Sequence, residues 1–70
     1  MKRQPLVSIV IPVRNEEKNI KRLLSFINRL DYPKSRLEVI IVDGMSTDKT
    51  VELSKRFNVK IIKNPLIIRV

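Results

Sequence analysis

The sequence predicts an α/β fold, half of a doubly wound domain in which three strands alternate with two helices. Three observations predict it: two nearly continuous β-branched runs, at residues 6–13 and 37–42, and a helical apolar pattern between them, at residues 20–30. Strands that alternate with helices favour a parallel sheet with right-handed crossovers. We expect one domain over residues 1–70, because no repeat, low-complexity segment or linker divides the chain.

The first strand is predicted at residues 6–13, where nearly every side chain is apolar. This pattern is typical of a strand that is buried on both faces. Asn15 follows, and we expect it to cap a helix, with Glu16 and Glu17 at the positive end of the helix dipole. The helix ends before Pro33, since a residue that precedes proline avoids helical geometry. Its buried side is predicted from spacing alone: Ile20, Leu23, Leu24, Ile27 and Leu30.

The second strand, at residues 37–42, runs into a polar turn at residues 43–48. Ser46 or Thr47 is expected to cap the second helix there. That helix has a short buried side formed by Val51, Leu53, Ser54 and Phe57. A third strand is predicted at residues 59–62, and Pro65 ends it. The apolar residues 66–70 could form one more short strand.

The composition favours a small globular protein. The net charge is +8, but the fifteen basic residues are scattered. Lys18, Lys21, Arg22 and Arg29 are predicted to form the solvated face of the first helix, so we do not expect a nucleic-acid partner. The chain has no cysteine, and it has no apolar run of the roughly 20 residues that a membrane span needs. We therefore expect a cytoplasmic location.

Two polar clusters follow the first two strands, and ligands of open α/β sheets bind outside the carboxyl ends of strands. The first cluster runs through Arg14, Asn15 and Glu16, and the second runs from Asp43 through Gly44 and Ser46. Backbone N–H groups at either helix start could hold a phosphate. Asn15 and Ser46 have a competing structural role as helix caps. Asp43 has no evident capping role, which favours a ligand contact.

Several other kinds of site are excluded. The single glycine rules out a glycine-rich phosphate loop, and the absence of histidine and cysteine rules out the usual nucleophilic triads. No D-x-D pair is present to hold a divalent metal, so we predict neither a metal site nor catalytic residues within this chain.

Two segments resemble the signatures of family 2 glycosyltransferases. Residues 7–17, VSIVIPVRNEE, are similar to the opening strand of that family, and residues 38–50, EVIIVDGMSTDKT, are similar to its second signature. Tyr32 and Pro33, before the second strand, also resemble the family. The resemblance implies the N-terminal, nucleotide-binding part of a GT-A fold, a three-layer Rossmann-like architecture with parallel strands in the order 3-2-1.

The resemblance also implies a function. The chain would bind the nucleotide part of a UDP- or GDP-sugar, and the full-length enzyme would transfer the sugar with inversion, using Mg²⁺ or Mn²⁺. The product would be a polysaccharide or glycolipid, made at the cytoplasmic face of the membrane with peripheral membrane association. The implied nucleotide-binding residues are Pro12, Val13, Arg14, Asn15, Glu16, Ile41, Asp43, Gly44 and Ser46.

The chain departs from the family pattern in two residues and in length. Arg14 stands where many members have an aromatic residue, and Gly44 replaces the second acid of a common Asp-Asp pair. The length implies a truncated chain that binds donor without turnover and exposes the edge of its first strand, which predicts a homo-oligomer. Two alternatives stay open: a non-catalytic nucleotide-binding or regulatory module, and a small basic nucleic-acid-binding protein.

Overall fold

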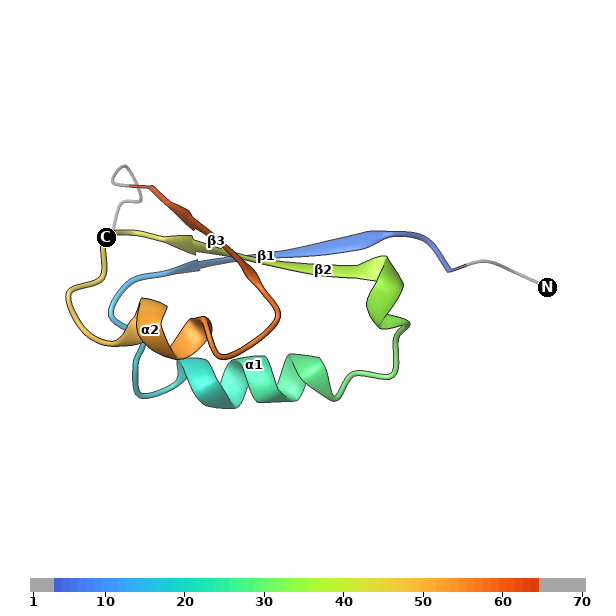
Figure 1. Cartoon of the computed structure of the whole chain (residues 1–70), viewed down its shortest axis with the longest axis horizontal. Helices are drawn as coiled ribbons and strands as arrows, with labels where there is room; N and C mark the ends of the chain where they lie inside the picture. The colour runs from blue at the N-terminus through green and yellow to red at the C-terminus, as the bar shows by residue number, and fades with distance from the viewer. Residues whose placement is uncertain (1–3, 65–70) are drawn as a thin grey trace.

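The computed structural model describes residues 4–64. The order of elements confirms the predicted β-α-β-α-β pattern (Figure 1). The elements are β1 (Val7–Val13), α1 (Ile20–Asn28), a 3₁₀ turn η1 (Lys34–Arg36), β2 (Leu37–Asp43), α2 (Thr50–Ser54) and β3 (Lys60–Lys63). All three strands are parallel, and β2 lies between β1 and β3, so the predicted order 3-2-1 is correct. The apolar residues 66–70 lie outside the described residues.

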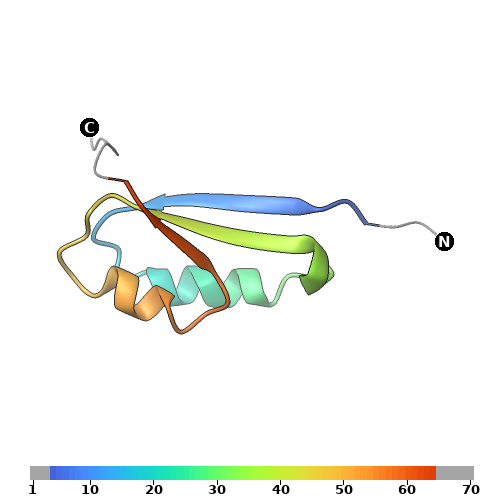
Figure 2. The ribbon, with the colours of Figure 1, turned by 45° about the horizontal axis from the view of Figure 1, so that its top comes forward.

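Both helices cover the same face of the sheet (Figures 1 and 2). Two right-handed crossovers that step in the same direction, from β1 to β2 and from β2 to β3, must place their helices on one side. The residues described here thus form two of the three expected layers. β1 consequently alternates between half-buried and exposed residues, and Val10 is 57% exposed. The prediction that this strand is buried on both faces is wrong for residues 4–64.

The core lies between this covered face and α1. Ile20, Leu24 and Ile27 of α1 pack with Val13, Val39 and Ile41 of the sheet. The predicted apolar face of α1 is therefore confirmed at its centre. Two other members of that face, Leu23 and Leu30, are 39% and 36% exposed and lie at its margin.

The helix starts differ from those predicted. α1 begins at Ile20 rather than next to Asn15, and no acidic residue lies in its first turn. α2 begins at Thr50, with Lys49 at its N-cap position. Asn15 and Met45 have positive φ angles, 54° and 65°, so each loop makes a left-handed turn after its strand. The prediction that Asn15 and Ser46 or Thr47 cap the helices is therefore wrong, because their side chains form hydrogen bonds between the two loops.

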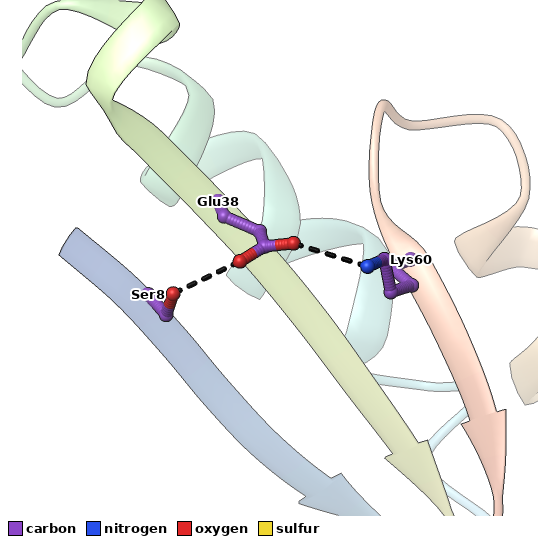
Figure 3. Close-up of polar contacts among 3 residues, drawn as sticks. All are labelled: Ser8, Glu38 and Lys60. Carbon is purple, nitrogen blue, oxygen red and sulfur yellow. Dashed lines mark hydrogen bonds and ion pairs between the residues drawn. The ribbon is translucent and has the colours of Figure 1, made fainter. Parts of the chain in front are cut away.

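The uncovered face of the sheet carries a polar row across all three strands (Figure 3). Glu38 of β2 accepts a hydrogen bond from the Ser8 hydroxyl at 2.9 Å, and its other oxygen lies 3.3 Å from the Lys60 ammonium. The hydrogen bond from Ser8, together with Lys60, lowers the pKa of the Glu38 carboxyl. No helix within residues 4–64 has the length and apolar character needed to cross a membrane.

Candidate functional site

The carboxyl ends of β1 and β2 bring the two predicted polar clusters side by side. Val13 and Asp43 are register partners at the ends of their strands. Just beyond them, the Gly44 N–H group donates to the Val13 carbonyl at 2.8 Å. The Nε–H group of Arg14 donates in turn to the Gly44 carbonyl at 3.1 Å. The first residues of both loops are thus fixed relative to each other.

Asn15 bridges the two loops instead of capping a helix. Its N–H group donates to the Ser46 hydroxyl at 2.9 Å, and its side-chain oxygen accepts from the Thr47 N–H group at 2.8 Å. The positive φ angle of Asn15 turns the chain toward the second loop, and asparagine tolerates this region better than most residues. Asn15, Ser46 and Thr47 therefore act as a cross-link between loops.

A second cross-link lies closer to the helices. The Glu16 N–H group donates to the Thr50 hydroxyl at 2.7 Å, and that hydroxyl donates to Asp48. The Glu17 N–H group donates to Asp48 at 3.2 Å, while the Glu17 carboxylate accepts from the Lys49 N–H group at 2.9 Å. Each loop therefore supplies a carboxylate to a backbone amide of the other. Glu17 was predicted only to complement a helix dipole, and that prediction is wrong.

Asp48 is the acceptor on which this second cross-link converges. Burial would raise the pKa of its carboxyl, but the hydrogen bonds from Thr50 and from the backbone of Glu17 outweigh burial and lower the pKa. A carboxylate that accepts several hydrogen bonds is stabilised in its charged form. Asp48 is consequently ionised over the physiological range.

Asp43 has a structural role that sequence reasoning did not find. Its side chain is fully buried, and both carboxylate oxygens accept from the Ser46 N–H group, at 3.3 and 3.2 Å. This arrangement closes the turn after β2. Ile41 is also fully buried, in the core beneath the loops. Both residues therefore support the loops, and neither presents a side chain at the surface.

Three of the predicted residues line a pocket beside β1. Pro12, Val13 and Glu16 share its wall with Ile11, Asn19, Ile20 and Leu23. Arg14 and Gly44 lie at the junction of the loops, and Asn15 and Ser46 lie between them. The predicted residues thus divide into a pocket wall, a junction at which Arg14 and Asn15 are exposed and Gly44 is buried, and a buried support.

The described residues do not fit a metal site. No group of three or more carboxylate, histidine or cysteine side chains comes together within residues 4–64. Asp43 and Asp48, the two aspartates of the second loop, already accept hydrogen bonds from backbone amides. The arrangement offers hydrogen bonds, one fixed guanidinium and an apolar pocket.

Sequence reasoning missed the linking roles of Glu17, Asp48 and Thr50. A signal for them was present, because two polar loops that follow neighbouring parallel strands must lie together. Which side chain meets which amide depends on the left-handed turns at Asn15 and Met45, and the sequence pattern does not show these turns.

Comparison with known proteins places this arrangement in a family. The glycosyl transferase family 2 model matches residues 8–66. The chain is similar to glycosyltransferase AglE of Haloferax volcanii, with 44% identity over 54 residues, which cover 77% of this chain and 18% of that protein. It is also similar to the probable glycosyltransferase YdaM of Bacillus subtilis, with 43% identity over 60 residues, which cover 86% of this chain and 14% of that protein.

Two solved structures share the fold. The mannosyltransferase PcManGT of Pyrobaculum calidifontis, in complex with GDP-Man and Mn²⁺, superposes with a TM-score of 0.83 at 29% identity, over 97% of this chain and 21% of that one. Staphylococcus aureus TarS 1-349 in complex with UDP-GlcNAc superposes with a TM-score of 0.78 at 32% identity, over 87% of this chain and 18% of that one. The chain thus spans about a fifth or less of these proteins. With both signatures apart from Val7 inside the matched region, and a fold shared with the two structures, the chain belongs to glycosyl transferase family 2.

Proposed function

We propose that this chain forms part of the donor site of a glycosyltransferase and binds the nucleotide of a UDP- or GDP-sugar. The observation that carries the proposal is the junction of the two loops at the carboxyl ends of β1 and β2, where Arg14 contacts Gly44. Open α/β sheets bind ligands at this end of their strands. Two similar structures, PcManGT and TarS, are complexes with GDP-Man and UDP-GlcNAc.

The proposed nucleotide surface consists of the predicted pocket wall and the junction of the two loops. Pro12, Val13 and Glu16 supply the pocket wall, and Arg14 and Ser46 supply polar groups at the junction. Asp43 and Ile41 hold the surface in place from below. Hydrogen bonds between the loops fix their arrangement, which lowers the entropy cost of ordering them on binding.

The proposed reaction is glycosyl transfer with inversion, toward a polysaccharide or glycolipid acceptor. Mn²⁺ accompanies GDP-Man in the PcManGT complex. We propose that Mg²⁺ or Mn²⁺ also accompanies the nucleotide-sugar donor of this protein. Residues outside 4–64 would hold the ion, because residues 4–64 do not fit a metal site. The chemistry that such an ion supplies is neutralisation of the diphosphate charge.

We also propose that the chain self-associates through β1. In the described sheet β1 pairs only with β2, so its other edge presents unpaired backbone groups. Val10 is exposed on the same strand, and β1 carries no charged side chain. An uncharged apolar edge favours pairing with a second chain.

Titration with UDP, GDP and single-stranded RNA at two salt concentrations tests the donor-site proposal. A nucleotide site at the loops predicts saturable UDP or GDP binding that survives added salt in part. Binding of RNA alone, lost steeply with salt, would instead mean that the exposed cations of α1 attract polyanions.

A further inference from the structure

We propose that Arg14 recognises the diphosphate of the donor, a role that rests on the proposed nucleotide site. Arg14 and Gly44 are the first residues after β1 and β2, respectively. The structure places them in direct contact, because the Arg14 Nε–H group donates to the Gly44 carbonyl at 3.1 Å.

Seven of the loop amides already donate hydrogen bonds within or between the loops, so they are not available to bind a phosphate. In the first loop, the N–H groups of Asn15, Glu16 and Glu17 donate to oxygens of the second loop. The N–H groups of the second loop also have partners. Those of Thr47 and Lys49 donate to Asn15 and Glu17 of the first loop. Those of Ser46 and Thr50 donate to Asp43 and Asp48 of their own segment. Few amides of the two loops are therefore left for the phosphate contact that the sequence suggested, which favours a side chain as the partner of an anion.

Arg14 is the cation that the structure holds in place at this junction. Its side chain reaches from the end of β1 to the loop after β2, so the guanidinium is fixed against both strands. Lys49 and Lys63 lie near the same end of the sheet, but no hydrogen bond within the described residues fixes either ammonium group. A guanidinium held through Nε keeps its two terminal amino groups for a bidentate contact with phosphate.

Within residues 4–64, no carboxylate forms an ion pair with Arg14. The ion pair found within residues 4–64 joins Lys60 to Glu38, on the uncovered face of the sheet. The nearby carboxylates of Glu17, Asp43 and Asp48 accept from backbone amides instead. The Glu16 carboxylate accepts from the side-chain amide of Asn19 at 3.4 Å. Gly44 has no side chain and therefore adds no charge beside the guanidinium. The two residues act together: glycine leaves the charge of arginine available to an anionic ligand.

The test compares nucleosides with their diphosphates by NMR titration of the full chain. UDP is measured against uridine, and GDP against guanosine, for the wild type, Arg14→Gln and the matched control Arg22→Gln on the exposed side of α1. We expect Arg14→Gln to weaken diphosphate binding about tenfold, the scale of a charge-assisted hydrogen bond, and to leave nucleoside binding unchanged. Arg22→Gln should change neither, and Arg14→Lys should restore part of the diphosphate affinity.

Each contrary outcome is specific. Equal weakening of nucleoside and diphosphate would show that Arg14 contacts the base, and equal effects of the Arg14 and Arg22 variants would show a general charge effect. Either result overturns the proposal while leaving the nucleotide site intact. A wild-type chain whose loop resonances respond to neither nucleosides nor diphosphates would overturn the proposed function itself.

Discussion

The hydroxyl oxygen of Thr50 accepts a hydrogen bond from the backbone N–H group of Glu16 at 2.7 Å and ties the start of α2 to the loop after β1. Thr50 is fully buried, and its hydroxyl also donates to Asp48. One side chain therefore joins two loops that are far apart in sequence.

Replacing Thr50 with valine removes this link at nearly constant volume. The Glu16 N–H group and the Asp48 carboxylate each lose a partner, which should lower the free energy of unfolding by about 1–3 kcal/mol. Thr50→Ser keeps the hydroxyl and is the matched control. Urea unfolding of both variants measures the difference; equal stabilities would contradict the linking role.

The lowered pKa of Asp48 predicts an acid-sensitive contribution to stability. Because the folded-state pKa lies below the unfolded-state value, the unfolded chain binds more protons in acid. The contribution is therefore present above about pH 3.9, the ordinary aspartate value, and is lost as the pH falls through the folded-state pKa.

Asp48→Asn removes this titration and keeps the shape of the side chain. The stability difference between wild type and variant should shrink as urea unfolding is repeated from about pH 7 down to about pH 3. Glu38, whose pKa is also lowered, is present in both proteins, so its titration does not change the difference in stability between them. A difference that stays constant with pH would show that the ionised carboxylate is not the stabilising form.

Ile40 and Ile41 are neighbours in β2 that face opposite sides of the sheet. Ile41 is fully buried in the core, whereas Ile40 is only partly buried on the uncovered face. Ile41→Val should cost about 0.5–1.5 kcal/mol in unfolding free energy, and Ile40→Val should cost less. Equal costs would mean that the second face is covered in solution, and would contradict the described arrangement unless the chain self-associates.

Self-association through β1 is tested with a charge on that strand. Val10→Lys should shift the wild-type oligomer toward monomer, because lysine on an edge strand discourages pairing. Val10→Thr keeps the β-branched shape without charge and should leave the oligomer intact. Sedimentation equilibrium at micromolar concentration measures this, and a wild-type monomer of 8.2 kDa would refute the proposal.

The strands were predictable because their signal is local. The runs at residues 6–13, 37–42 and 59–62 became β1, β2 and β3 with bounds shifted by one residue at most. Alternation with helices was enough to predict a parallel sheet, and the family resemblance implied the strand order.

The loop chemistry was not predictable, because tertiary contacts override local preferences there. Asn15 has the residue type of a helix cap, yet its side chain accepts from Thr47 in the other loop. Asp43 had no visible partner in sequence, yet it closes a turn onto the Ser46 N–H group. In both cases the decisive partner depends on the backbone path and not on sequence spacing. The predicted cluster was in the right place, with different roles for its members.

The junction of the two loops is the proposed nucleotide site. NMR titration with UDP and GDP tests it directly, and an affinity near millimolar, about 4 kcal/mol, is expected for a partial site. The account predicts shifts concentrated at residues 12–16 and 44–47. Shifts concentrated at the exposed cations in and beside α1, Lys18, Lys21, Arg22 and Arg29, would contradict it.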